Sequence, residues 1–309
     1  MLVNHQQMQK QSSGATKLPI YALVTPARNE AAFIEQTILS VIHQTVLPIK
    51  WVIVSDGSKD ETDEIVEGYV ARFPWIELVR MPQREDRHFG GKALAFNAGY
   101  EKLRKIKYDI IANLDADITF DEEYFCYLLK KFVQDPSLGV AGAPFRQGSS
   151  QYDYRFSRKE HVSGACQLFR RACFESIGGY VPLREGGIDL VAVVTARMKG
   201  WKTETFTGKY CIHNRSMGKA EPHLFKYILR SGVGDYRMGV HPIWQIFRTI
   251  YQTSNKPIFL LGFLHLVGYF WAMLIRIPKP VSKEFVRFRR KEQIRWLKES
   301  YKKVITLLD

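Results

Sequence analysis

Cysteine is scarce in this sequence, and its few residues are too scattered to form a structural framework. Cys126, Cys166, Cys173 and Cys211 include no CxxC pair and no spacing typical of a zinc site. Disulfide-stabilised secreted domains are far richer in cysteine, so the sequence argues against that class and suits a reducing compartment. Residues 1–17 are polar and lack the apolar stretch of a secretory signal, so we expect a flexible tail there.

Two glycine-rich phosphate-binding motifs are also missing. No GxGxxG follows the first predicted strand, which excludes a Rossmann-type dehydrogenase. No GxxxxGK[ST] occurs either, which excludes a P-loop ATPase at the level of the motif. Internal repeats are likewise absent. The length of 309 residues predicts one large domain or a domain with an appendage.

Acidic residues are outnumbered by basic ones. The chain carries 45 Lys and Arg against 31 Asp and Glu, a formal net charge of +14, and its pI is about 9.5. Residues 276–309 alone contribute +7 (11 − 4), which is half of the excess. A basic chain of this kind is suited to nucleic acid, anionic lipid or phosphorylated substrates.

The first half of the chain alternates short apolar runs with amphipathic segments. This alternation predicts a parallel sheet with crossover helices, in which ligands bind beyond the carboxyl ends of the strands. The unusual residues cluster at those ends, in 26–30, 56–62 and 115–117. We predict strands over 20–25, 51–55, 76–80 and 108–114, and helices over 31–44, from the end of DGSKDET to about Arg72, over 91–105 and over 187–201. In the less regular middle third, 139–145 and 165–171 are candidate strands.

Two aspartates stand two positions apart at the end of a strand-like run. Asp115 and Asp117 would face the same side of an extended chain, where like charges repel unless a cation lies nearby. Carboxylate oxygens are ligands that Mg²⁺ and Mn²⁺ prefer, so the pair is a candidate metal site. The alternative is that Asp117 caps the helix that follows it, as Asp residues often do.

A second unusual stretch is the charge-free apolar run 257–275, followed by the basic, aromatic-rich residues 276–309. As a helix, the run would extend roughly 28 Å, close to the ~30 Å hydrocarbon core of a bilayer. The basic flank suits an anionic cytoplasmic leaflet. We therefore expect a membrane-associated segment that re-enters or lies on the surface. A buried helix–helix contact is the alternative.

Five motifs, in this order, resemble family 2 glycosyltransferases with the GT-A fold. They are TPARNE (25–30), VSDGSKDET (54–62), GGKALAFNAG (90–99), LDAD (114–117) and GGIDLVAVVTARMKGW (186–201). The stretch from 212 onward is similar to membrane-associated bacterial members. The resemblance implies a GT-A domain over 18–225, with a Rossmann-like, mainly parallel mixed sheet and flanking helices. A helical, membrane-associated region over 226–309 would follow.

The resemblance also implies an activity and its ligands. The expected reaction is inverting, metal-dependent transfer from a UDP- or GDP-type sugar to a lipid-linked or cell-surface glycan. The enzyme would work at the cytoplasmic face of the cell membrane with Mn²⁺ or Mg²⁺. Implied metal ligands are Asp117, Asp115 and His213. Implied nucleotide-sugar contacts are Pro26, Ala27, Arg28, Glu30, Asp56, Lys92, Asp115 and Arg215, with Lys219 beside Arg215 on the same loop.

Several of these positions also have simple structural explanations. Asp56 would accept a hydrogen bond from the nucleobase, or else be a turn residue in the sequence SDGS. Arg28 and Lys92 could be solvated surface cations, and His213 could be a structural histidine.

Asp189 is the candidate catalytic base, which would take the proton from the acceptor hydroxyl. The family usually has Glu-Asp at this helix start, whereas Ile188 precedes Asp189 here. Glu185 is therefore kept as the fallback, and an N-cap role for Asp189 is the simpler alternative.

Two other classes of function were weighed. A sugar-phosphate nucleotidyltransferase would share a Rossmann-like sheet but needs a glycine- and basic-rich first loop, which TPARNE lacks. A non-catalytic basic module for membrane or nucleic acid would explain the net charge. Nucleic-acid binding, however, predicts basic residues on the functional loops, where this chain carries aspartates. We therefore expect no nucleic-acid partner.

Overall fold

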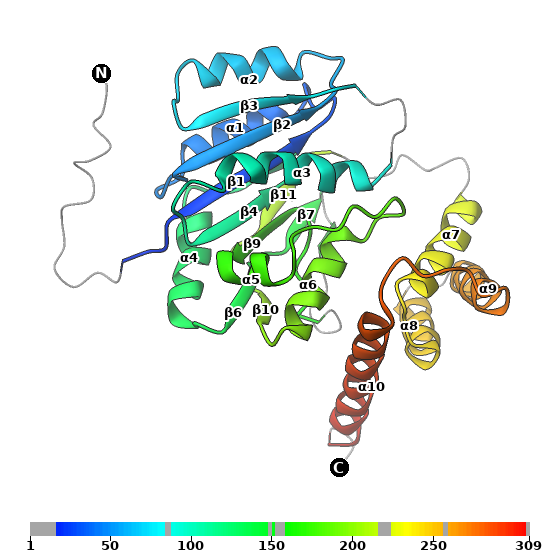
Figure 1. Ribbon diagram of the computed structural model, residues 1–309. Helices are drawn as coiled ribbons and strands as arrows, with labels where there is room; N and C mark the ends of the chain where they lie inside the picture. Colours follow the sequence, from blue (N-terminus) through cyan, green and yellow to red (C-terminus); the bar gives the residue numbers. More distant parts are fainter. Residues whose placement is uncertain are drawn as a thin grey trace.

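The computed structural model describes residues 17–83, 88–147, 150–151, 158–215, 224–255 and 259–306. Figure 1 shows a central sheet covered by helices, with a separate group of helices formed by the C-terminal part of the chain.

Seven strands form the central sheet, in the order β10-β6-β9-β4-β1-β2-β3. β9 is antiparallel to its neighbours β4 and β6, and the other pairings are parallel. The fold is therefore mixed α/β with a mainly parallel sheet, and the four predicted strands are confirmed as β1 to β4. The bounds are β1 Tyr21–Ala27, β2 Lys50–Asp56, β3 Ile76–Met81, β4 Ile110–Leu114, β6 Leu138–Gly142, β9 Cys166–Arg170 and β10 Lys202–Thr205.

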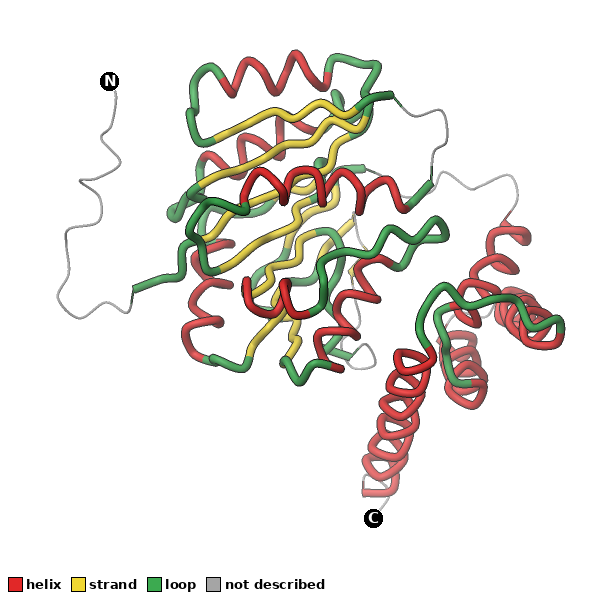
Figure 2. Tube along the Cα trace, in the orientation of Figure 1, coloured by secondary structure: helices red, strands yellow, loops and turns green. Residues whose placement is uncertain are grey.

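Helices cover both faces of this sheet (Figure 2). Successive side chains of a strand point to opposite faces, so Tyr21 and Leu23 of β1 enter one apolar cluster while Ala22 and Val24 enter the other. The first cluster includes side chains of α1 (Ile34–Ile42), α2 (Thr62–Val70) and α4 (Tyr124–Gln134). The second includes α3 (Gly90–Leu103), α5 (Arg171–Ser176) and α6 (Ile188–Met198). The four predicted helices are therefore confirmed as α1, α2, α3 and α6.

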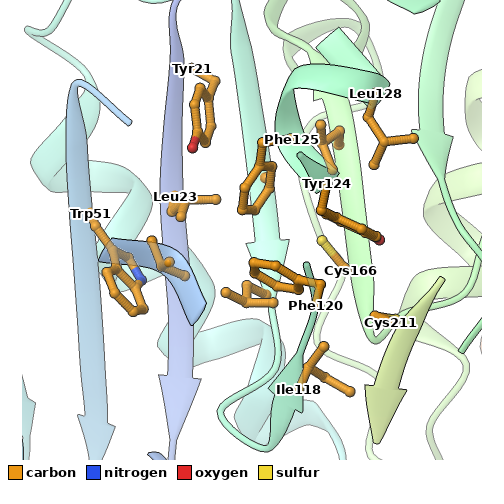
Figure 3. Close-up of a cluster of buried hydrophobic side chains, with 14 of the residues drawn as sticks. Tyr21, Leu23, Trp51, Ile118, Phe120, Tyr124, Phe125, Leu128, Cys166 and Cys211 are labelled. Carbon is orange, nitrogen blue, oxygen red and sulfur yellow. The ribbon is translucent and has the colours of Figure 1, made fainter. Parts of the chain in front are cut away.

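The first cluster is rich in aromatic side chains (Figure 3). Tyr21 stacks on Phe125 with ring centroids 4.8 Å apart, and its hydroxyl donates to the Val46 carbonyl at 2.7 Å. Trp51 is fully buried and donates from Nε1 to Thr25 Oγ1 at 2.9 Å. Burying each such side chain stabilises the fold by roughly 1.5–3 kcal/mol. This packing fixes β1 and β2, whose ends carry the polar loops.

A small second sheet lies next to the end of β4. Its strand order is β5-β11-β7-β8, with bounds Ile118–Thr119, Cys211–His213, Phe145–Gln147 and Ser150–Gln151. β11 is antiparallel to β5, and this pairing sets His213 opposite Ile118, directly after Asp117. Residues almost a hundred positions apart in the chain are thereby brought together.

Four helices follow the α/β part: α7 (Leu224–Arg237), α8 (Pro242–Asn255), α9 (Phe259–Leu274) and α10 (Lys283–Thr306). The apolar run predicted from the sequence lies mostly in α9. Among the described residues, no helix is both long and apolar enough to cross a membrane. α10 is joined to α6 by a buried bidentate ion pair, in which Arg197 donates to Glu292 at 2.7 and 3.0 Å.

Candidate functional site

A cavity of about 620 Å³ opens beyond the carboxyl ends of β1, β2 and β4. Parallel strands place their carboxyl ends at one edge of the sheet, which is why these loops converge. The cavity is lined by most of the residues singled out from the sequence: Pro26, Ala27, Arg28, Glu30, Asp56, Lys92, Asp115, Asp117 and His213.

The loops after β1 and β2 are tied together by hydrogen bonds. The Lys59 amide donates to Asn29 Oδ1 at 2.8 Å, and the Glu30 amide donates to Thr62 Oγ1 at 2.8 Å. Arg28 Nη1 lies 3.7 Å from Asp56 Oδ2 across the same gap. These contacts make the two loops one wall of the cavity, and Asp56 is buried within it.

Lys92 and Asp115 form another ion pair in the cavity lining. Lys92 also donates to the Gly164 carbonyl at 3.1 Å, and the Asp115 amide donates to the Ala165 carbonyl at 2.9 Å. Burial raises the pKa of Asp115, an effect that the Lys92 ammonium opposes and Asp117 reinforces. Lys92 is therefore a cavity residue at the start of α3 and not a solvated surface cation.

Asp117 stands at the centre of a second charged group. It does not cap a helix, because α4 begins at Tyr124 with Glu123 at its N-cap. Arg215 Nε donates to Asp117 Oδ2 at 3.1 Å, and the same guanidinium pairs with Glu30. His213 Nε2 lies 3.6 Å from Asp117 Oδ2.

His213 is held in one tautomer. Its Nδ1 lies 2.8 Å from the Arg215 backbone carbonyl, which can only accept, so Nδ1 carries the proton. In the neutral ring the Nε2 lone pair then faces the Asp117 carboxylate. Two acceptors facing each other suit a shared cation, and a backbone hydrogen bond on the second nitrogen is the usual support of a metal-binding histidine.

Glu30 is a second acid of the cavity whose pKa is raised. Burial raises its pKa to about 7, with further increases from Asp117 and Asp115 and an opposing decrease from Arg215. Desolvation is thus the largest influence on this carboxyl, and the neighbouring charges shift its pKa in both directions.

The residues present fit a divalent cation held together with a phosphate group. Within the described part of the chain, no three His, Cys, Asp or Glu side chains gather as a self-sufficient metal site. Mg²⁺ and Mn²⁺ at nucleotide sites commonly take only one or two protein ligands, with phosphate oxygens and water completing the shell. Asp117 and His213, which face each other in the cavity lining, could provide two such ligands, and Asp115 lines the same cavity.

The two candidate bases lie beside the cavity, outside the lining that the described residues form. Asp189 is the second residue of α6, whose N-cap is Gly187, so it is not the cap. It packs against Gly164, where an added Cβ would lie 2.9 Å from Asp189 Oδ2. Glu185 is exposed and accepts a hydrogen bond from Arg237 of α7 at 2.7 Å. Asp189 is thus linked to the Lys92–Asp115 pair through Gly164, whose carbonyl accepts a hydrogen bond from Lys92.

Three lining residues that lie outside the five motifs, His88, Phe89 and Arg184, were not predicted from the sequence. His88 and Phe89 directly precede the GGK motif, so their neighbourhood was a usable signal. Arg184 precedes Glu185 in a loop with no recognisable pattern. Lys219, predicted to act beside Arg215, lies outside the described residues.

Comparison with known proteins identifies relatives of the chain. The family model described as "Glycosyl transferase family 2" matches residues 22–185, more than half of the chain. A poly-beta-1,6-N-acetyl-D-glucosamine synthase of Staphylococcus aureus is 23% identical over 271 residues, covering 80% of this chain and 61% of that protein. The synthase of Staphylococcus epidermidis is 21% identical with the same coverage. The chain thus spans about 61% of the length of these relatives.

Two solved structures share the fold. A mannosyltransferase from Pyrobaculum calidifontis, in complex with GDP-Man and Mn²⁺, has a TM-score of 0.55 and 19% identity, and the match covers 97% of this chain and 88% of that one. TarS 1–349 of S. aureus, in complex with UDP-GlcNAc, has a TM-score of 0.53 and 14% identity, covering 69% and 64% of the two chains. At these identities the likeness shows that the fold is GT-A-like.

Proposed function

This chain belongs to glycosyl transferase family 2, and from that premise we propose that it transfers a sugar from a nucleoside-diphosphate sugar to an acceptor hydroxyl. The donor is of the UDP or GDP type, and the acceptor is a lipid-linked or cell-surface glycan at the cytoplasmic face of the membrane. The reaction uses Mn²⁺ or Mg²⁺ and inverts the anomeric configuration.

One observation carries the donor assignment: the cations and carboxylates of the cavity pair with one another. Lys92 pairs with Asp115, and Arg215 pairs with Glu30 and Asp117. A diphosphate that binds with a divalent cation would replace these ion pairs. The phosphate oxygens would pair with Lys92 and Arg215, and the metal would bind the carboxylates. A neutral ligand would leave these charges paired and gain little from them.

Different residues of the cavity then bind different groups of the donor. Asp56 accepts a hydrogen bond from a ring N–H of the base, and Arg28 beside it orients the carboxylate. Lys92 and Arg215 bind the diphosphate. Asp117 and His213, with Asp115 nearby, would hold the metal, which supplies Lewis-acid stabilisation of the leaving diphosphate.

Asp189 acts on the acceptor. It removes the proton from the acceptor hydroxyl as that oxygen forms a bond to the anomeric carbon and the bond from this carbon to the diphosphate breaks. The attack comes from the side opposite the leaving group, so the configuration inverts. The relatives support the donor class: the mannosyltransferase was solved with GDP-Man and Mn²⁺, and TarS with UDP-GlcNAc.

Thermal stability against UDP, GDP, CDP, dTDP and ADP, each with Mn²⁺ and with chelator, tests this proposal. We expect UDP or GDP to stabilise the protein only with Mn²⁺, by about 2.7 kcal/mol at 100 times its dissociation constant. Asp117→Asn should abolish the metal-dependent part. Asp121→Asn is the matched control, because Asp121 is an exposed acid paired with Lys209 outside the cavity lining. If no nucleotide stabilises folded, metal-supplied protein, the donor assignment is wrong.

A further inference from the structure

Helix α8 has its polarity reversed relative to a water-exposed helix. Its outward residues Ile243, Ile246, Phe247 and Ile250 recur at i, i+3, i+4 and i+7 and are 59%, 39%, 43% and 61% exposed. On the inward side, Gln245 is fully buried. A surface helix of a protein in water buries its apolar face and exposes its polar one, so α8 is arranged for an apolar exterior.

Helix α9 has the same arrangement. Leu260, Phe263, Val267, Trp271 and Leu274 form one exposed stripe along it. No residue of this helix, FLLGFLHLVGYFWAML, carries a formal charge.

Three polar side chains of α7, α8 and α9 pair with one another inside this helical group. His265 of α9 turns inward, with Nε2 2.7 Å from Asp235 Oδ2 of α7. Arg248 of α8 pairs with the same carboxylate, and these two partners lower the pKa of Asp235 against the effect of burial. A charged interior beneath an apolar exterior is the pattern of protein in contact with lipid.

The packing of α7 on α9 fits the same environment. An added Cβ at Gly232 of α7 would lie 2.1 Å from the His265 carbonyl oxygen, and one at Gly268 of α9 would lie 2.2 Å from the Leu229 carbonyl oxygen. The two helices therefore touch backbone to backbone through glycine. Small residues at helix contacts are typical where lipid, and not water, surrounds the helices.

The charge on the outside of these helices has one sign. Between residues 224 and 283 the sequence contains one acidic residue, Asp235, which belongs to the interior cluster. Lys226 and Arg230 of α7, and Arg276 and Lys283 after α9, are exposed. An apolar surface bordered by cations is complementary to a bilayer with anionic head groups.

We propose that α7, α8 and α9 form a surface that inserts into one leaflet of an anionic bilayer, with the outward residues of α8 and α9 named above facing the acyl chains. α9 has 16 residues, which as a helix measure about 24 Å and fall short of the ~30 Å hydrocarbon core. The helices therefore enter one leaflet and do not cross the bilayer. Figure 1 shows these helices gathered to one side of the α/β part. In this proposal the α/β part stays outside the bilayer.

This surface is directly connected to the loop before the candidate base. Arg237, at the end of α7, pairs with Glu185 at 2.7 Å, and the next residue, Met238, packs on Gly187. Asp189 follows two residues later. An acceptor carried on a lipid would thus reach the catalytic domain beside Asp189. This consequence rests on the proposed transfer reaction, whereas insertion itself rests only on the surface described above.

Vesicle flotation of the full chain tests insertion without any activity measurement. Vesicles of phosphatidylcholine alone are compared with vesicles of phosphatidylcholine and phosphatidylglycerol. We expect the protein to float with both and more strongly with the anionic mixture. The variant Ile243→Ser/Phe263→Ser should partition at least about tenfold less, because two large apolar side chains no longer leave water. Ile49→Ser is the matched control, since Ile49 is 47% exposed but belongs to the α/β part.

A second measurement locates the inserted surface. Lipids brominated on the acyl chain should quench tryptophan fluorescence, and Trp271→Phe should remove most of the quenching. Failure of the wild-type chain to float with either vesicle overturns the proposal. So does undiminished flotation of the double serine variant, or sedimentation of the wild type as a stable dimer that ignores vesicles, because the apolar face would then bind a second copy. Loss of nucleotide binding would leave flotation unchanged, so the two proposals fail separately.

Discussion

The unusual pKa of Glu30 predicts a pH dependence of stability that can be traced to one side chain. Burial raises this pKa from 4.5 to about 7. A folded state that binds the proton more tightly than the unfolded state is most favoured at low pH. The stability associated with Glu30 is therefore complete below about pH 4.5 and is lost as the pH rises through about 7.

The magnitude follows from the size of this change. Each unit of pKa corresponds to about 1.4 kcal/mol, so the rise from 4.5 to about 7 changes the unfolding free energy by at most about 3.4 kcal/mol. Roughly 2 kcal/mol of it falls between about pH 5.5 and about pH 8.5. The Glu30 side chain is 17% exposed, and solvent screening reduces the figure to about 1–2 kcal/mol.

Glu30→Gln isolates the effect, because the amide oxygen can still accept from Arg215 but cannot ionise. Urea unfolding with chelator, at about pH 5.5 and about pH 8.5, measures both proteins. Between these conditions the wild type should lose about 1–2 kcal/mol more unfolding free energy than the variant. Glu64→Gln, at an exposed position on α2, should follow the wild type. Identical pH profiles for wild type and Glu30→Gln would refute the account of a desolvated carboxyl.

Asp189→Asn should keep metal-dependent nucleotide binding while sugar transfer to the acceptor falls by about 10²–10⁴, because the amide cannot take a proton. Persistent transfer alongside an inactive Glu185→Gln would make Glu185 the base. Glu292→Ala should lower the unfolding free energy by about 3–5 kcal/mol, since it leaves the Arg197 charge buried without its partner. Replacing both residues by methionine should recover much of this loss in the same urea assay; equal losses in both variants would mean that packing, and not charge, is responsible.

Local patterns were enough to predict the α/β fold. Alternating apolar runs and amphipathic segments identified β1 to β4 and α1, α2, α3 and α6, because side-chain periodicity is a property of neighbouring residues. The candidate strands 139–145 and 165–171 correspond to β6 and β9. The antiparallel direction of β9 was not predicted, since strand direction depends on which distant strand it joins. Most of the candidate cavity residues were also identified in advance, because they occupy the loops that a parallel sheet brings to one edge.

The contacts that set the chemistry could be read only from the tertiary structure. Nothing near Glu30 in the sequence shows that Arg215, 185 positions away, pairs with it, or that burial brings its pKa to about 7. Likewise, the proton on His213 Nδ1 follows from one backbone carbonyl in the folded chain.

The C-terminal helices show the same division. By itself, the sequence determined that an uncharged apolar run exists and that basic residues follow it. Only the folded arrangement decided that the apolar stripes of α8 and α9 face outward while Asp235, Arg248 and His265 pair inside. Hydrophobic periodicity specifies that a helix has two different faces, but which face turns inward depends on contacts with other elements, and those are set by the whole chain.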